Sequence, residues 1–192
     1  MGAGKSTALA ALERLGAATI SADEVVHELY GSDEVRDAVT QRWGPEVAPD
    51  GIVDRAAVAR RAFAGPDERA WLEGLLWPLV GARVAQWRAA LDDAAPRPRA
   101  AVVETPLLFE AGLEGGYDAT IAIVADEDVR AERAAARGHH AVDERSARQF
   151  SQEEKAARAT YVVANSGTVE QLELALAAVL EKLDAAAVPD RT

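Results

Sequence analysis

Apolar runs and helical periodicity alternate along the chain, and this pattern predicts short strands separated by helices. Leu9, Leu12 and Leu15 lie three residues apart among alanines, which is typical of a helix, and Gly16 is a suitable end for it. Buried strands are predicted by short apolar runs at residues 17–20, 100–103, 119–124 and 161–163. Because helical segments separate these runs, we expect a parallel sheet that binds ligands at the carboxyl ends of its strands.

The stretch between the first two predicted strands is helical. Residues 24–94 carry mostly helical periodicity, with turn signals such as Gly44-Pro45. Asp54 follows another turn and is placed to cap the helix behind it. We therefore expect a single domain over residues 1–192, in which this stretch is an insertion carried by the sheet.

The C-terminal third contains one polar segment and one amphipathic segment. Residues 138–150 are polar and have few apolar anchors, which indicates low local stability. Residues 168–183 carry apolar positions at helical spacing and predict a final helix. The tail after Leu183 is rich in alanine and contains Pro189, so we expect it to fray.

The composition is that of a globular protein and excludes several classes of function. A chain of 192 residues with 49% hydrophobic and 28% charged residues can form one domain with a core. The net charge of −11 repels phosphate backbones and anionic lipids, so we expect no nucleic-acid or membrane partner. There is no cysteine, which excludes disulfides and zinc–cysteine sites. No segment resembles a signal peptide or a membrane span, and we expect a cytoplasmic protein.

The chain begins with a candidate phosphate-binding loop. Gly2, Ala3 and Gly4 are small residues whose amides can face phosphate oxygens, and a helical pattern follows them directly. In such a loop Lys5 reaches the β- and γ-phosphates, Ser6 holds Mg²⁺, and the helix N-terminus adds its dipole. The alternative is a glycine-rich N-terminus with no ligand.

Asp23 stands at the end of the first predicted strand. A carboxylate near the γ-phosphate can accept the proton of a substrate hydroxyl or position Mg²⁺ through water. An aspartate after a strand is also a common helix cap, and a helical pattern follows here. The residue type and its position leave both interpretations open.

Three arginines share one face of a predicted helix. Arg130, Arg133 and Arg137 are spaced by three and four residues, so their like charges repel unless an anion neutralises them. Glu132 and Glu144 can do so as surface pairs. A triphosphate does so better, because its transition state spreads charge over the equatorial oxygens.

Together these residues resemble the dephospho-coenzyme A kinase family over nearly the whole chain. The most distinctive string is Pro-Leu-Leu-Phe-Glu at residues 106–110, and the loop at residues 1–7 is similar to the second half of the family's phosphate-binding loop. Further matches are Ser21-Ala22-Asp23, the Arg133 and Arg137 pair, Arg145 with Gln149, and Asn165-Ser166-Gly167.

The resemblance implies a fold and a division of the chain. The fold is α/β, a P-loop nucleoside-kinase-like three-layer fold with a parallel sheet, a helical substrate-binding insertion and a small lid. The insertion would be residues 24–97 and the lid residues 133–150. The core would be formed by residues 1–23, 98–132 and 151–192.

The resemblance also implies the residues that handle the nucleotide. Arg133 and Arg137 would clamp the triphosphate of ATP, the co-substrate, and Asn165 would lie near its base. Mg²⁺, the cofactor, would be held by Ser6, with Glu104 contacting it through water. The ATP phosphates would be bound by Gly2, Ala3, Gly4, Lys5, Ser6 and Thr7.

The acceptor would be dephospho-coenzyme A, phosphorylated on the 3′-hydroxyl of its ribose to give coenzyme A and ADP in the last step of coenzyme A biosynthesis. Asp23 would be the base for this hydroxyl. Lys5, Arg133 and Arg137 would complete the catalytic set. Dephospho-coenzyme A would be held by Asp23, Arg55, Leu107, Leu108, Phe109 and Glu110.

The chain departs from the family pattern at four places. The strand and first glycines of the loop are not in the sequence, so we expect that its start was assigned too late. Ser21 replaces the first of two aspartates, and Thr160 replaces an aspartate before the last strand. Trp77 stands where the family usually has histidine, which leaves the substrate contact there open.

Two alternatives to this function remain. One is another small-metabolite or nucleotide P-loop kinase, against which the string at residues 106–110 argues. The other is a catalytically impaired nucleotide-binding homologue, which the shortened loop favours and the retained Lys5 and Asp23 oppose. We expect a monomer or a small homo-oligomer.

Overall fold

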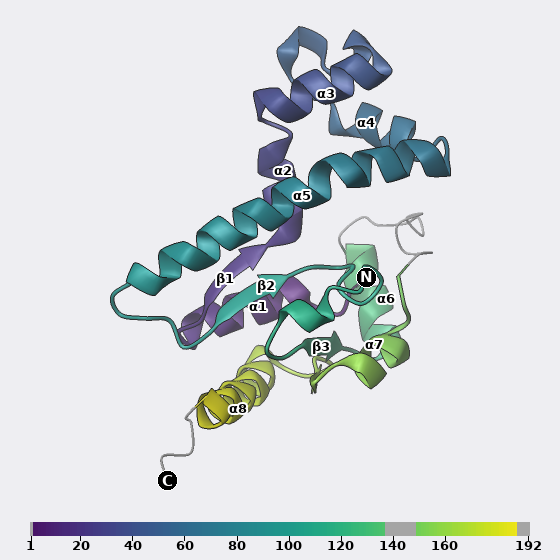
Figure 1. The fold of residues 1–192 in the computed structure, drawn as a ribbon. Coiled ribbons are helices and arrows are strands. Elements are labelled where there is room, and N and C mark those ends of the chain that lie inside the picture. The colour runs from purple at the N-terminus through teal and green to yellow at the C-terminus, as the bar shows by residue number, and fades with distance from the viewer. Residues whose placement is uncertain (1, 137–148, 188–192) are drawn as a thin grey trace. The chain divides into compact units, whose positions relative to one another are not determined.

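The computed structural model describes residues 2–136 and 149–187 of the chain, which divide into two compact units (Figure 1). The first unit combines residues 1–19 with residues 98–192, and the second contains residues 20–97. The second unit begins slightly before the insertion expected at residues 24–97. The division into core, insertion and lid stays a prediction, and most of the expected lid lies outside the described residues.

In the part of the chain that the structure describes, four strands of four residues each form two pairs. β3 (Ile121–Val124) runs parallel to β4 (Tyr161–Ala164), with Ile121 opposite Tyr161 and Val124 opposite Ala164. β1 (Ala18–Ser21) pairs with β2 (Ala101–Glu104), and the N–H of Ala18 donates to the carbonyl of Ala100 at 2.9 Å. The sequence predicted one parallel sheet. Among the described strands, none lies between β2 and β3 to join their hydrogen-bond ladders, so the strands remain in two pairs.

The core of the first unit lies between two helices and the strands. α1 (Lys5–Arg14) and α8 (Val169–Ala187) pack together, and Leu172, Leu176 and Leu180 follow the i, i+4 spacing that forms one apolar stripe. Each of these leucines is at most 1% exposed, and burying one contributes about 1.5–3 kcal/mol. α8 continues four residues beyond Leu183, where the sequence predicted fraying, because alanine is the best helix former.

Two shorter helices complete the first unit. α6 (Glu127–Ala136) follows β3, and α7 (Gln152–Arg158) precedes β4. Ser151 begins α7 with a capping box, in which its hydroxyl accepts from the N–H of Glu154 and the carboxylate of Glu154 accepts from the N–H of Ser151.

The second unit is helical, as the sequence predicted. Its helices are α2 (Ala22–Leu29), α3 (Asp33–Trp43), α4 (Arg55–Ala62) and α5 (Pro66–Ala90). Single 3₁₀ turns occur in this unit at η1 (Pro45–Val47), η2 (Pro49–Gly51) and η3 (Leu91–Asp93), and in the first unit at η4 (Glu114–Gly116). Val35, Val39, Val47 and Val58 are fully buried at the centre of this unit.

Two of the tryptophans belong to the core of the second unit. Trp43 and Trp71 meet edge to face with ring centroids 5.0 Å apart, and the indole N–H of Trp43 donates to Glu68 at 2.6 Å. Trp77, at the position where the family usually has histidine, is 48% exposed.

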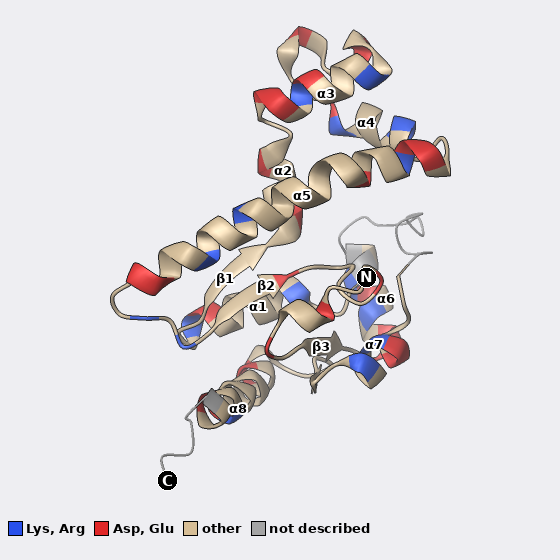
Figure 2. Ribbon diagram, in the orientation of Figure 1, with Lys and Arg blue, Asp and Glu red and all other residues tan. Residues whose placement is uncertain are grey.

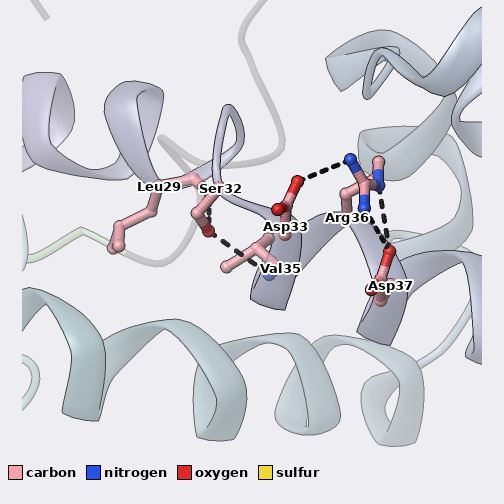
Figure 3. A network of polar contacts seen from close by, with 6 residues as sticks. All are labelled: Leu29, Ser32, Asp33, Val35, Arg36 and Asp37. Carbon is pink, nitrogen blue, oxygen red and sulfur yellow. Dashed lines mark hydrogen bonds and ion pairs between the residues drawn. The ribbon is translucent and has the colours of Figure 1, made fainter.

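Two helices of the second unit, α3 and α4, begin at side-chain caps. Ser32 caps α3, since its hydroxyl accepts from the N–H of Val35 at 3.3 Å and donates to the carbonyl of Leu29 at 2.7 Å (Figure 3). Asp54 caps α4 by accepting from the N–H groups of Ala56 and Ala57 at 2.9 and 3.2 Å, which confirms the cap predicted from the sequence.

Charged residues of both signs are spread over the helices of both units (Figure 2). In Figure 3, for example, Arg36 lies between Asp33 and Asp37 and bonds to both carboxylates on α3. Among the helices that the structure describes, none is long and apolar enough to cross a membrane.

Candidate active site

The predicted phosphate-binding loop forms a turn that only glycine fits at two positions. Gly2 and Gly4 have φ values of 86° and 85°, in the left-handed region that side chains disfavour. A Cβ on Gly2 would lie 2.6 Å from the main-chain oxygen of Arg130, and one on Gly4 would overlap with Nδ2 of Asn165. The loop is therefore pressed against α6 and against the segment that follows β4.

The loop leads into a helix start with no carboxylate of its own. Gly4 is the N-cap of α1, no side chain caps the helix, and its first turn contains no acidic residue. The first main-chain N–H groups of α1 and the positive end of its dipole are thus directed to the space in front of Lys5, Ser6 and Thr7. Lys5 and Ser6 are exposed, and Thr7 is half-buried. Such a helix start is suited to binding an anion.

Lys5 and Glu104 form an ion pair beside the loop. Nζ of Lys5 lies 3.5 Å from Oε1 of Glu104, the last residue of β2, so the carboxylate stands at the carboxyl end of a strand, as predicted. The Lys5 side chain is 44% exposed and that of Glu104 is 15% exposed. The lysine is thus held near the loop by a contact that an anion can replace.

Arg133 and Asn165 join α6 to the loop. Nη1 of Arg133 donates to the main-chain oxygen of Asn165 at 2.8 Å, and Nδ2 of Asn165 donates to the carbonyl of Ala3 at 2.8 Å. The structure thus brings together the loop, Glu104, Arg133 and Asn165 within the first unit. Arg137, the other predicted clamp residue, lies outside the described residues.

The string at residues 106–110 is anchored by a residue that the sequence analysis missed. Oε1 of Glu110 accepts from Nζ of Lys155 at 2.9 Å and from the N–H of Phe150 at 2.7 Å. Nζ of Lys155 also donates to the carbonyl of Pro106 at 2.7 Å. The sequence carries a weak signal for this role, since Lys155 is one of only three lysines in a chain of 21 basic residues.

The side chain of Glu110 is 11% exposed, and its environment favours the ionised form. Burial alone would raise the pKa of Glu110, but hydrogen bonds from Lys155 and from main-chain N–H groups outweigh it and hold the pKa below its usual range. The other oxygen, Oε2, makes no hydrogen bond within the described residues. Of the predicted substrate-binding residues beside it, Phe109 is buried, and Leu107 and Leu108 are half-buried.

Asp23 and Arg55 belong to the second unit. Ser21, not Asp23, is the N-cap of α2, and Asp23 is an exposed residue within its first turn. Capping by Asp23, one of the two interpretations left open by the sequence, is therefore not its role. Nη1 of Arg55 donates to Nδ1 of His27 at 2.5 Å, across α4 and α2. The approach of Asp23 and Arg55 to the loop stays a prediction.

The residues present could hold Mg²⁺ only together with the nucleotide, whose phosphates would supply the remaining ligands. Within the described part of the chain, no group of three or more His, Cys, Asp or Glu side chains could hold a metal ion. Mg²⁺ needs fewer protein ligands, because it keeps several waters and binds substrate phosphates. The exposed hydroxyl of Ser6 and the carboxylate of Glu104 supply oxygen ligands of that type.

Sequence comparisons show that this chain is similar to known proteins over most of its length. A family model described as dephospho-CoA kinase matches residues 1–171. A dephospho-CoA kinase of Deinococcus radiodurans is 39% identical over 187 residues, which cover 96% of this chain and 89% of that one. Another, from Rhizobium meliloti, is 34% identical over 192 residues, or 96% and 95% of the two chains.

Two solved structures are similar to this chain over nearly its full length. A crystal structure of a Thermus thermophilus protein superposes with a TM-score of 0.78 at 34% identity and covers 95% of this chain and 93% of that one. A dephospho-CoA kinase from Campylobacter jejuni superposes with a TM-score of 0.69 at 20% identity, covering 98% and 95%, which supports the fold.

Proposed function

The chain belongs to the dephospho-CoA kinase family, and we propose that it transfers the γ-phosphoryl group of ATP at the loop formed by residues 2–7. The acceptor is the ribose 3′-hydroxyl of dephospho-coenzyme A, and the products are coenzyme A and ADP. This phosphotransferase reaction is the last step of coenzyme A biosynthesis. The observation that carries the assignment to this loop is the glycine turn that opens α1, with Lys5 and Glu104 beside it.

The loop binds the triphosphate of ATP. Its main-chain N–H groups and the start of α1 face the phosphates, and Lys5 leaves its pair with Glu104 to contact the β- and γ-phosphates. Arg133 lies beside the loop and adds positive charge where the transition state places negative charge on the equatorial oxygens. Arg137 is proposed as a second such arginine from the sequence alone.

Ser6 would hold Mg²⁺ through its hydroxyl, with Glu104 contacting the ion through water. When bound, the ion neutralises charge on the β- and γ-phosphates and orients them. Glu104 lies 3.5 Å from Nζ of Lys5, the side chain proposed to contact the β- and γ-phosphates, so its carboxylate stands close to the proposed ion position. This proximity supports a Mg²⁺-dependent enzyme.

Asp23 is proposed as the general base. Its carboxylate takes the proton of the ribose 3′-hydroxyl while the oxygen attacks the γ-phosphorus and ADP leaves with the electrons of the broken P–O bond. Its position in the first turn of α2, exposed and not used as the cap, supports this role.

The acceptor is held by Arg55 and by residues 107–110. Arg55 is exposed at the start of α4 and can contact a phosphate of dephospho-coenzyme A. The half-buried Leu107 and Leu108 offer apolar contacts, and Phe109 and Glu110 complete this proposed set. We place the enzyme in the cytoplasm, where ATP is available, as a monomer or a small homo-oligomer.

The test is an ADP-release assay on the purified chain with several acceptors. We expect turnover with dephospho-coenzyme A and Mg²⁺-ATP, a product that carries one additional phosphate on the ribose by mass spectrometry, and little turnover with AMP, CMP or UMP. Faster phosphorylation of a nucleoside monophosphate would overturn the acceptor assignment, and ATP binding without transfer to any acceptor would favour the impaired homologue.

A further inference from the structure

Asn165 connects three parts of the first unit. It follows β4, is 4% exposed, and its N–H donates to the carbonyl of Val124 at 2.7 Å, which extends the pairing of β4 with β3 by one residue. Its main-chain oxygen accepts from Arg133, and its side-chain amide donates to the carbonyl of Ala3. Asn165 is therefore held by the strand pair on one side and contacts the phosphate-binding loop on the other.

The side chain of Asn165 and the glycine in the loop depend on each other. A Cβ on Gly4 would overlap with Nδ2 of Asn165, so the amide group occupies the space where any other residue would carry a side chain. Asn165 itself is buried, and losing the hydrogen bond of a buried group costs more than losing one at an exposed position.

The hydrogen bond to Ala3 determines the direction of one amide in the loop. The carbonyl of Ala3 and the N–H of Gly4 belong to the same peptide unit, and in a trans peptide these two groups point in opposite directions. Because Asn165 holds the carbonyl toward the protein, the N–H of Gly4 is directed away from Asn165. That N–H directly precedes the start of α1, where the anion is expected.

We propose that Asn165 is a positioning residue, which orients the Ala3–Gly4 peptide so that the loop binds phosphate before the nucleotide arrives. The proposal rests on the function given above, in which the loop binds ATP. It differs from the role implied by the family resemblance, a position near the nucleotide base, because the side-chain contact is with the loop, where one N–H of the amide donates to Ala3.

The two roles are distinguished by a ligand without a base. Mg²⁺-tripolyphosphate contains the phosphates alone, so it is bound by an oriented loop and ignored by a base contact. We would titrate wild type, Asn165→Asp and Asn165→Ala with tripolyphosphate, ATP and GTP by calorimetry. Asn165→Asp keeps the shape and removes the donor, and Asn165→Ala removes it without adding a charge.

We expect both variants to lose affinity for all three ligands in the same proportion, by roughly 5- to 150-fold, the range for a buried hydrogen bond whose partner is left unpaired. In the kinase assay, KM for ATP should rise by a similar factor, kcat should fall less, and KM for dephospho-coenzyme A should stay unchanged. A loss of packing alone would not move these parameters selectively.

Thr160→Val is the matched control. Thr160 and Thr120 exchange hydrogen bonds of about 3.0 Å at the opposite end of the β3–β4 pair, so this variant loses polar contacts of the same strands away from the loop. We expect a lower melting temperature and wild-type affinity for tripolyphosphate. If Asn165→Asp melts far below this control, Asn165→Ser, which keeps a shorter donor without charge, replaces it in the titrations.

The outcomes separate this proposal from the proposed function. Unchanged tripolyphosphate affinity in the Asn165 variants, or a loss confined to ATP and absent with GTP and tripolyphosphate, would overturn the positioning role while leaving the kinase assignment intact. A different result would refute the proposed function and support the positioning role. In that case the wild type would bind tripolyphosphate, the Asn165 variants would bind it less tightly, and dephospho-coenzyme A would not be phosphorylated.

Discussion

At the scale of single residues, Lys5 illustrates how a site can keep its cation in place before the substrate arrives. Its pair with Glu104 is 3.5 Å long and the lysine is 44% exposed, so the pair contributes little to stability. A weak pair suits the proposed function, in which the lysine exchanges a carboxylate for a phosphate during each turnover.

Lys5→Ala should lower kcat by about 10³-fold, because the cation at the transferring phosphate is lost. The melting temperature should hardly change, since the pair is exposed. Lys182→Ala is the control, a lysine of α8 near the ring of Tyr161, and it should keep wild-type turnover. Near-normal turnover in Lys5→Ala would contradict the assignment of the phosphate-binding loop; kcat and thermal unfolding are the two measurements.

Asp23→Asn should lower kcat by roughly 10²-fold while ATP binding is retained, because the amide cannot accept the ribose proton. Its control is Glu24→Gln, because Glu24 is the neighbouring exposed acid in the first turn of α2. This substitution removes the same favourable interaction between a carboxylate and the helix dipole. Both variants should be equally stable. Equal turnover in the two variants would assign the base to another residue, and Glu104→Gln would be measured next.

At the scale of elements, α7 holds the string at residues 106–110 through a single lysine. The Glu110 side chain is 11% exposed and that of Lys155 is 23% exposed. Each charge therefore depends on the other to offset the free-energy cost of removing it from water. A partly buried pair of this kind contributes little in net terms while both partners are present, and removing one of them is costly.

Lys155→Met should destabilise the protein by about 2 kcal/mol at neutral pH, because it leaves the buried carboxylate of Glu110 without its cation. Arg158→Met, an exposed basic residue at the end of the same helix, is the control and should cost much less. The free energy of unfolding from denaturant titration measures both. A cost in Lys155→Met no larger than in the control would show that the pair does not hold the string.

The pH dependence of the same pair has a definite sign. In wild type the folded pKa of Glu110 is lowered, so its stabilising contribution is present at neutral pH and is lost as the pH falls through that folded value. In Lys155→Met burial remains without the cation, which raises the pKa of Glu110 and makes the ionised form unfavourable. The two unfolding free energies should therefore converge below about pH 4, where glutamate carboxyl groups usually become protonated. A difference that stays constant from pH 7 to pH 3 would rule out this coupling.

Gly4, the N-cap of α1, and Gly81, inside α5, should respond in opposite directions to alanine. Gly81 lies inside α5 with nothing within 4 Å of an added Cβ, so Gly81→Ala should stabilise by about 0.5–1 kcal/mol through helix propensity. Gly4→Ala combines a φ of 85° with overlap on Asn165, so it should lower both stability and tripolyphosphate affinity. Denaturant titration checks both signs, and a stabilised Gly4→Ala would contradict the loop geometry.

At the scale of the whole molecule, the two units should respond to different ligands. The loop, Glu104, Arg133 and Asn165 belong to the first unit, whereas Asp23 belongs to the second. Mg²⁺-ATP at 100 times its Kd should stabilise the chain by about 2.7 kcal/mol. Amide exchange should slow first in residues 2–15 with ATP alone, and in α2 and α4 only after dephospho-coenzyme A is added. Equal protection of both units by ATP alone would mean that they respond as one body.

Local chemistry was enough to predict several parts of this protein from its sequence. The glycine turn before Lys5, the cap at Asp54 and the carboxylates at the ends of β1 and β2 each depend on a few consecutive residues, whose backbone preferences act without distant contacts. The family followed from such short segments in a fixed order along the chain.

Only the tertiary structure decided which of these segments contact one another. Asn165 and Ala3 are 162 residues apart in the chain, and Lys155 and Pro106 are 49 apart, so no periodicity within a segment indicates either contact. The division of the strands into two pairs likewise depends on hydrogen bonds between strands and not within them. A side chain such as that of Asn165 has several possible partners of similar energy, and packing selects one of them by burying it against Gly4.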